Sequence, residues 1–186
     1  MNYYISDIHF GDERILKLCK RPFNTLDDMN NYIIQKWNSR VSNTDTVYIL
    51  GDIGFDDKSI NIYKKLNGIK ILIIGNHDLA FIDEIKKSRV FNKIDYTLEI
   101  KDSVNDVFLC HYPVVDWPGI DEKSVLLYGH IHNKTSLNDI RFEQIKNYYK
   151  DKKAFNCSAD VIGFEPRTLK ELMKLKEANS NESYIN

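Results

Sequence analysis

Polar residues that can bind a metal ion follow five short apolar runs of this 186-residue chain. The five places read Asp7-Ile8-His9, Gly51-Asp52, Gly75-Asn76-His77-Asp78, His111 and Gly129-His130-Ile131-His132. Together they contain every histidine of the chain. Carboxylate oxygens, neutral imidazoles and an amide oxygen suit a divalent transition-metal ion. One histidine after a strand would more simply be a core or surface residue, but all five in such positions predict a clustered metal site.

The apolar runs are the strands that must position these residues. They alternate with amphipathic segments, which predicts an α/β fold. The expected strands are Tyr3–Ser6, Thr46–Leu50, Ile69–Ile74, Thr97–Ile100, Val104–Cys110, Val125–Tyr128 and Ala154–Cys157. Neighbouring strands lie about 5 Å apart, and ligands of α/β proteins gather at the carboxyl ends of the strands. Residues that follow several strands can therefore share one small site.

The spacing at the strand ends fits such a site. In an extended segment, residues two apart point to the same side. Asp7 and His9 are therefore expected to face one cavity, and the same holds for the pair His130 and His132. A sharp exit from a strand requires positive φ or a close backbone approach, which glycine allows. The glycines expected to serve in this way are Gly51, Gly75 and Gly129.

Three amphipathic segments are expected to form helices. Capping boxes at Thr25–Asp28 and Thr168–Glu171 open two of them, and the remaining helix is expected from Asp57 to Leu66. The stripes expected to be buried are Met29, Tyr32, Ile33 and Trp37, then Ile60, Tyr63 and Leu66, and finally Leu169, Leu172, Met173 and Leu175.

The composition is that of an ordinary globular protein, with 42% hydrophobic and 28% charged residues. A net charge of −1 provides no positive field to attract nucleic acid or an anionic membrane. Three widely spaced cysteines indicate neither a disulfide framework nor a zinc ribbon. No segment approaches the ~18 consecutive apolar residues of a transmembrane helix. We therefore expect one cytoplasmic domain over residues 1–178, followed by a polar tail over 179–186.

The five motifs, D-x-H, G-D, G-N-H-D, an isolated His and G-H-x-H, resemble in this order those of the calcineurin-like metallophosphoesterase family. "RPF" at Arg21–Phe23, "HYP" at His111–Pro113 and "NCSADVIGFEP" near the C-terminus are similar to a group of small bacterial and phage members. The resemblance implies two mixed β-sheets packed face to face and flanked by helices.

The resemblance also implies a role for each polar residue. The implied ligands are Asp7, His9 and His132 for one divalent metal ion and Asn76, His111 and His130 for the other, with Asp52 bridging both. Mn²⁺ is the expected metal, and Fe, Zn²⁺, Ni²⁺ or Co²⁺ are alternatives. His77 would protonate the leaving oxygen or stabilise the transition state. Arg21 would bind a phosphate oxygen of the substrate, the alternative being a surface arginine before a rigid proline turn.

The implied activity is hydrolysis of a phosphodiester or phosphomonoester by in-line attack of a metal-bound hydroxide. Two divalent ions and two carboxylates leave a local charge of about +2, which attracts a small phosphorylated substrate, with a nucleotide-type diester favoured. A nuclease of the same family is one alternative, although the neutral chain gives nucleic-acid binding no support. A non-catalytic protein-interaction scaffold is the other, and the complete set of ligands disfavours it.

The segment "GDIGFDD" departs from the protein phosphatase branch of the family. Phe55 stands where a second aspartate is expected, and the block has no arginine, which disfavours a Ser/Thr protein phosphatase. Asp56 is then either a partner of His77 or a residue that starts a turn or helix. Asp78 is expected to brace its own turn. The remaining aromatic candidates, either pocket walls or scaffold, are Tyr112 and Trp117.

Overall fold

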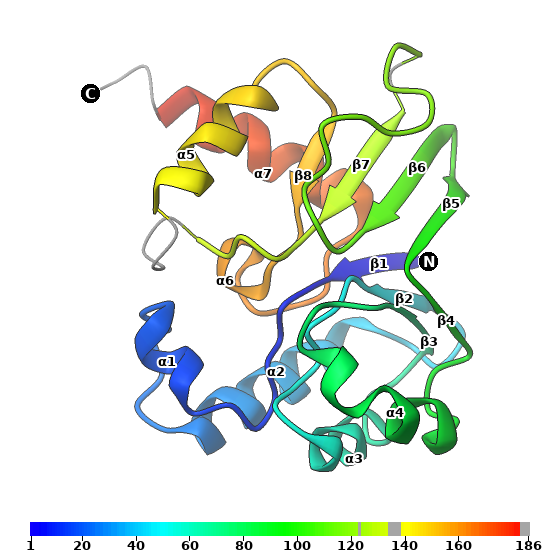
Figure 1. The fold of residues 1–186 in the computed structure, drawn as a ribbon, viewed down its shortest axis with the longest axis vertical. Coiled ribbons are helices and arrows are strands. Elements are labelled where there is room, and N and C mark those ends of the chain that lie inside the picture. The colour runs from blue at the N-terminus through cyan, green and yellow to red at the C-terminus, as the bar shows by residue number, and fades with distance from the viewer. Residues whose placement is uncertain (123, 134–138, 183–186) are drawn as a thin grey trace.

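The computed structural model of the protein describes residues 1–122, 124–133 and 139–182, and its strands form two four-stranded sheets (Figure 1). The first sheet holds β1 (Asn2–Ile5), β2 (Thr46–Ile49), β3 (Ile69–Ile73) and β4 (Lys93–Asp95), in that order. The second holds β5 (Thr97–Asp102), β6 (Asn105–Cys110), β7 (Val125–Tyr128) and β8 (Ala154–Asn156). The expected pair of sheets is confirmed, although only the second sheet is mixed. In it β5 and β6 are antiparallel, whereas all pairs of the first sheet are parallel.

The parallel register brings the polar strand ends together. Ile5 pairs with Ile49, and Ile49 pairs with Leu72, so β1, β2 and β3 end nearly level. In the second sheet, β6, β7 and β8 also run parallel. Ser6 and Ser158 form an isolated parallel bridge just beyond β1 and β8, which joins the two sheets at this edge. The residues that follow the strands therefore emerge along one shared edge.

Two hydrophobic clusters occupy the two faces of the second sheet. Leu109 and Leu127 join residues of the first sheet, such as Ile49, in the larger cluster between the sheets. Their strand neighbours Leu126 and Tyr128 belong instead to the smaller cluster. This alternation follows from the two-residue period of a strand. The smaller cluster therefore lies on the outer face of the second sheet.

Helices cover both sheets, as expected. In Figure 1, α2 (Leu26–Arg40), α3 (Ile60–Tyr63) and α4 (Ile82–Ser88) lie with the first sheet, and α5 (Asp139–Tyr148) and α7 (Leu169–Glu182) lie with the second. The shorter elements are α1 (Arg14–Leu18), α6 (Ala159–Ile162), and the 3₁₀ turns η1 (Asp57–Ser59) and η2 (Asp78–Phe81). Within the described ranges, no helix is both long and apolar enough to cross a membrane.

The first predicted helix is confirmed with one change in its buried stripe. The Thr25 hydroxyl accepts the backbone N–H of Asp28 at 3.1 Å, and the Asp28 carboxylate accepts that of Thr25 at 3.2 Å. Met29, Ile33 and Trp37 are fully buried, but Tyr32 is 38% exposed. Buried residues four apart define the inner face of α2, and Tyr32 lies to its side.

The other two helix predictions were correct in part, since Leu169 and Leu172 are buried but Met173 and Leu175 are only partly buried. The segment from Asp57 to Leu66 divides into η1 and the single turn of α3, although Ile60, Tyr63 and Leu66 are all buried. The second capping box is present, because Glu171 accepts the backbone N–H of Thr168 at 2.8 Å. Helix α7 runs on to Glu182, into the expected polar tail, whose residues 183–186 lie outside the described ranges.

Candidate metal centre

The seven expected metal ligands lie together at the shared edge of the two sheets. Asp7, His9 and His132 form one cluster, and Asp52, His111 and His130 form another; within each, the potential ligand atoms are no more than 4.8 Å apart. The Asn76 amide oxygen lies 3.1 Å from Nε2 of His111 and 3.0 Å from Nδ1 of His130, and so joins the second cluster. We refer to the first cluster as the first half-site and to the second cluster with Asn76 as the second half-site.

Asp52 faces both half-sites. Its Oδ2 atom lies 3.7 Å from Nε2 of His9 and 3.6 Å from Nε2 of His111. Its Oδ1 atom accepts the backbone N–H of His77 at 2.9 Å, which fixes the orientation of the carboxylate. One buried carboxylate is thus positioned to serve two cations at once.

The backbone at the ligands is left-handed, which corrects the expectation of an extended segment. Five ligands have positive φ, namely Asp7 (53°), His9 (55°), Asp52 (54°), His130 (72°) and His132 (50°). A left-handed residue other than glycine costs about 1–2 kcal/mol, and such conformations persist where surrounding contacts enforce them. Both members of each pair still face the site, while the intervening Ile8 and Ile131 are buried.

Glycines at the strand exits serve the expected purposes. Gly51 has a φ of 88°, and it packs directly against the backbone of Gly75. A Cβ atom on Gly75 would collide with the Asp52 carboxylate. A Cβ atom on Gly129 would collide with the Ser6 hydroxyl and the Asp7 carboxylate. The carboxylates can therefore reach the site only because these positions have no side chain.

Hydrogen bonds orient two of the imidazoles toward the site. Nδ1 of His111 lies 2.7 Å from the Leu50 carbonyl oxygen. Because a carbonyl can only accept, Nδ1 carries the proton and Nε2 is left with the lone pair that binds a cation. Nδ1 of His132 lies 2.7 Å from Oδ2 of Asp160, and Nε2 of the same ring lies 3.7 Å from Oδ1 of Asp7.

Arg21 lies beneath the first half-site, and its guanidinium is buried. Nε donates to Asp160 at 2.7 Å, Nη1 to the Ile8 carbonyl at 2.7 Å, and Nη2 to the Asp7 carbonyl at 2.6 Å. The guanidinium therefore links the loop of Asp7 and His9 to the carboxylate that orients His132. This geometry supports neither of the roles expected for Arg21, since the side chain is neither at the surface nor directed toward an incoming substrate.

The site concentrates buried negative charge. Burial, followed by the neighbouring Asp7, raises the pKa of Asp52 to about 7. Burial lowers the pKa of His132, but Asp7 and Asp160 outweigh burial and bring it to about 11. Burial and nearby cations hold the pKa of His9 well below its usual value, so this ring is neutral. A cation that binds here would compete with the proton on His132 and stabilise the paired carboxylates.

His9 provides a direct test of whether the residues fit a metal ion. Both of its ring nitrogens are buried, and neither has a hydrogen-bond partner within the described residues. A buried polar atom without a partner costs about 1–3 kcal/mol. The ring belongs to the half-site that also contains Asp7 and His132, and its Nε2 atom lies 3.7 Å from Oδ2 of Asp52. The donor set, carboxylates with imidazoles and no thiolate in either half-site, therefore fits divalent ions of the expected kind.

His77 lies at the exposed mouth of the site and belongs to neither half-site. The centroid of its ring is 5.1 Å from that of His9. Burial lowers the pKa of His77, and the nearby carboxylate of Asp12 opposes that shift. Asp56 accepts the backbone N–H of Lys58 at 3.0 Å and caps η1, so the helix-start interpretation of Asp56 is confirmed.

Asp78 braces its own turn, as expected. Its carboxylate is fully buried and accepts three backbone N–H groups, from Gly75 at 2.8 Å, Ile53 at 2.9 Å and Asp52 at 3.0 Å. Trp117 is a core residue whose Nε1 donates to the Ser124 hydroxyl at 3.0 Å. Tyr112 is 44% exposed, and the centroid of its ring is 4.6 Å from that of His130.

Three supporting residues escaped the sequence analysis. Asp160 orients His132, Ser158 donates to the Asp7 carboxylate at 2.7 Å, and Asp12 is buried beside His77. A signal existed for the first two, since Ser158 and Asp160 are polar residues that follow shortly after strand β8. That strand end has no histidine, and it was therefore not grouped with the other five.

Comparison with known proteins finds similarity over nearly the whole chain. The model of the family described as calcineurin-like phosphoesterase matches residues 3–180. The uncharacterized protein MJ1445 of Methanocaldococcus jannaschii is 31% identical over 188 residues, 99% of this chain and 96% of that protein. The gene 66 protein of Mycobacterium phage L5 is 26% identical over 73% of this chain and 79% of its own. The crystal structure of AQ665 from Aquifex aeolicus, a protein of unknown function, is 26% identical and superposes with a TM-score of 0.72, covering 94% of this chain and 98% of that one.

Proposed function

The chain belongs to the calcineurin-like phosphoesterase family, and from this premise we propose that it hydrolyses nucleotide-type phosphodiesters at a centre of two divalent metal ions. The observation that carries the proposal is the pair of adjacent half-sites with Asp52 between them. Two such half-sites fit two cations, and a phosphoryl group is the anion that a paired centre best accommodates.

The proposed ligands follow from the geometry. Asp7, His9 and His132 would hold one ion, and Asn76, His111 and His130 the other, with Asp52 shared. Mn²⁺ is the proposed metal, because oxygen and imidazole ligands without thiolate suit it. When bound, the ions would acidify a water molecule and neutralise charge on the phosphoryl oxygens. Arg21 would position the first half-site through Asp160 and the Asp7 loop, without contact to the substrate.

His77 would donate the proton that the leaving oxygen requires. Its ring is exposed at the mouth, and its backbone N–H is held by Asp52. A positioned general acid is worth about 10²–10⁴-fold in rate. Burial lowers the pKa of His77, and Asp12 is the carboxylate that opposes this shift most, ahead of Asp7, and so it would favour the protonated, donating form of the ring.

Exposed aromatic rings support a nucleotide substrate. Tyr112 borders the second half-site through His130. Phe55 is 51% exposed, and the guanidinium of Arg14 lies 4.6 Å from the centroid of its ring. Arg14 also pairs with Asp12, the neighbour of His77. Base stacking on such rings tolerates any base and contributes about 1–3 kcal/mol for each base.

The first test compares diester and monoester hydrolysis. Wild type would be assayed with Mn²⁺ on bis-p-nitrophenyl phosphate, on p-nitrophenyl phosphate and on a dinucleotide. We expect the diesters to be preferred, and we expect Asp52→Asn to lower kcat/KM at least about 10³-fold, since Asp52 serves both half-sites. Asp56→Asn is the matched control, because Asp56 only caps η1. Its kcat/KM should stay within about twofold of wild type. Preference for the monoester, or full activity of Asp52→Asn, would contradict the proposal.

A second test separates proton donation from metal binding. In His77→Gln, kcat should fall by about 10²–10⁴-fold, while calorimetric titration still shows two equivalents of bound Mn²⁺. Loss of one equivalent would instead make His77 a metal ligand. An unchanged kcat would remove it from the mechanism.

A further inference from the structure

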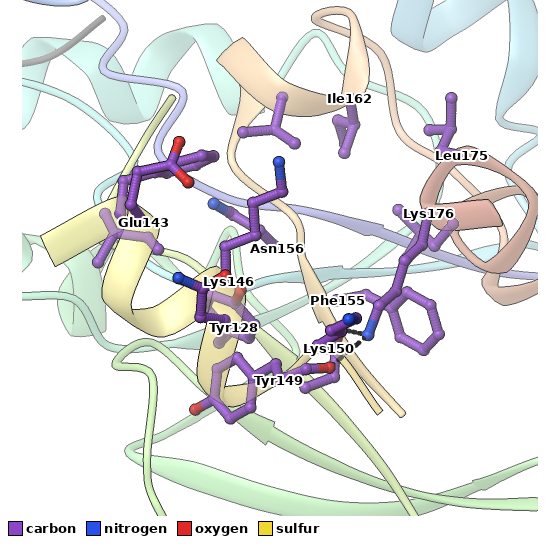
Figure 2. A pocket seen from close by; sticks show the side chains of 16 residues that line it. Tyr128, Glu143, Lys146, Tyr149, Lys150, Phe155, Asn156, Ile162, Leu175 and Lys176 are labelled. Carbon is purple, nitrogen blue, oxygen red and sulfur yellow. Dashed lines mark hydrogen bonds between the residues drawn. The ribbon is translucent and has the colours of Figure 1, made fainter. Parts of the chain in front are cut away.

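A cavity of about 430 Å³ lies between α5, α7 and strands β7 and β8 (Figure 2). Apolar side chains make up most of its wall, among them Phe142, Phe155, Ile162 and Leu172. The cavity is open to solvent on one side. Its volume falls in the range of small-molecule sites.

The cavity separates the two hydrophobic clusters of the fold. Tyr128 and Tyr149 on one side belong to the smaller cluster, and Ile162 and Leu172 on the other belong to the larger one. All four are at most 5% exposed, so the rest of the core holds them in place. Tyr149 is further fixed by the hydrogen bond that its hydroxyl donates to the Val114 carbonyl at 2.6 Å. The site is therefore formed before any ligand arrives, which lowers the entropic cost of binding.

Positive charge surrounds the cavity. Lys146 and Lys150 are exposed at its rim, and Lys176 lies deeper, where Nζ donates to the carbonyls of Tyr149 at 2.8 Å and Lys152 at 2.7 Å. Figure 2 shows the hydrogen bond from Lys176 to Tyr149, close to Phe155. Among the described residues of the wall, Glu143 is the single acid. Three cations and one anion around an apolar space favour a ligand that has an apolar body and a negative group.

We propose that this cavity binds a small amphipathic organic anion, with an aromatic or acyl body inside and a carboxylate, sulfonate or phosphate group at Lys146 and Lys150. The proposal commits to this class because the wall supplies both an apolar interior and charge complementarity at the rim.

The cavity also lies directly behind the first half-site. Ile131, part of the wall, stands between His130 and His132. Asn156, also in the wall, donates its amide to the His132 carbonyl at 2.9 Å. A molecule in the cavity therefore contacts residues that position a ligand of the centre. Binding to the cavity and binding of a cation to His132 are then linked, and each changes the affinity of the other; this step rests on the proposed metal centre.

The test uses two fluorescent probes with similar aromatic bodies, 1-anilinonaphthalene-8-sulfonate and the uncharged N-phenyl-1-naphthylamine. The full chain should bind one equivalent of each probe under native conditions. Lys146→Glu combined with Lys150→Glu should lower the affinity for the anionic probe by roughly tenfold. The affinity for the neutral probe should stay within about twofold of wild type. Lys170→Glu combined with Lys174→Glu makes the same charge change on exposed positions of α7 outside the cavity and should alter neither affinity.

Leu175→Trp places a larger side chain in the wall and should abolish binding of both probes without lowering the melting temperature. Absence of saturable binding to wild type, an equal loss in the control pair, or probe binding retained by Leu175→Trp would overturn the site. Saturating Mn²⁺ should change the affinity of the anionic probe at least twofold, and an unchanged affinity would overturn the link to the first half-site. Because no turnover is measured, the cavity and the hydrolase proposal can fail independently.

Discussion

The two half-sites contain similar ligands but differ in what holds those ligands in place. In the first, a buried ion pair between distant segments fixes the geometry, since Arg21 and Asp160 are 139 residues apart in the chain. In the second, the supports come from residues that neighbour other ligands, across separations of 61 and 26 residues in the chain. The Leu50 carbonyl, two residues before Asp52, orients His111, and Asp78, two residues after Asn76, holds the backbone of Asp52.

The half-sites also differ in exposure. The three ligands of the first half-site are buried, whereas Asn76 and His130 of the second are partly exposed. A buried ion pair gives a well-defined geometry, but it destabilises the fold strongly when one partner is lost. A backbone carbonyl is always present and cannot be removed by substitution. The first half-site should therefore be vulnerable at the side chains of Arg21 and Asp160, whereas in the second the Leu50 carbonyl cannot be lost and Asp78 is the supporting side chain that can.

The largest expected effect is a loss of stability when Arg21 of the buried Arg21–Asp160 pair is replaced. Arg21→Met keeps much of the side-chain length but leaves Asp160 and the carbonyls of Asp7 and Ile8 without their donor. Removal of one partner of a buried pair costs about 3–5 kcal/mol, and we expect this loss in the urea unfolding free energy of metal-free protein.

Arg14→Met is the matched control for that loss. Arg14 also forms a two-point pair with an aspartate, Asp12, but its side chain is 61% exposed. An exposed pair contributes about 0–1 kcal/mol. Equal losses of unfolding free energy in the two variants would show that burial does not account for the contribution of the Arg21 pair to stability.

A smaller and more selective effect is expected at Asp160. Asp160→Asn preserves an oxygen that can accept from Nδ1 of His132 but removes the charge. Loss of such a supporting group typically lowers metal affinity 10–100-fold. In a two-site calorimetric titration with Mn²⁺, the affinity for one equivalent should fall by about that factor, while the affinity for the other is unchanged. If both equivalents weakened together, the two half-sites would behave as one unit and the contrast between them would not hold.

The same contrast marks the limit of what the sequence could predict. The ligands could be located because each follows an apolar strand by one to four residues, a local pattern, and the brace Asp78 follows β3 by five. Arg21 and Asp160 could not be paired, because nothing local connects two residues so far apart in the chain.

The left-handed backbone at five ligands was also missed, since a two-residue alternation of polar and apolar residues suits a strand and a turn equally well. Strand β4 was missed because it has only three residues, none of them fully buried, and they form no apolar pattern.

The smallest expected effect concerns the open side of the second half-site. Tyr112 packs against His130 and has almost half of its surface free, so it should contact the substrate rather than support a ligand. Tyr112→Leu should raise KM for a dinucleotide by roughly fivefold or more, the equivalent of about 1 kcal/mol of stacking. The value of kcat and the affinity for both equivalents of Mn²⁺ should not change.

Tyr32→Leu, at a tyrosine of similar exposure on α2, should leave KM unaltered. Weakened Mn²⁺ binding in Tyr112→Leu would mean that Tyr112, like Asp78, supports the geometry of the second half-site, and the difference between the half-sites would then be one of degree.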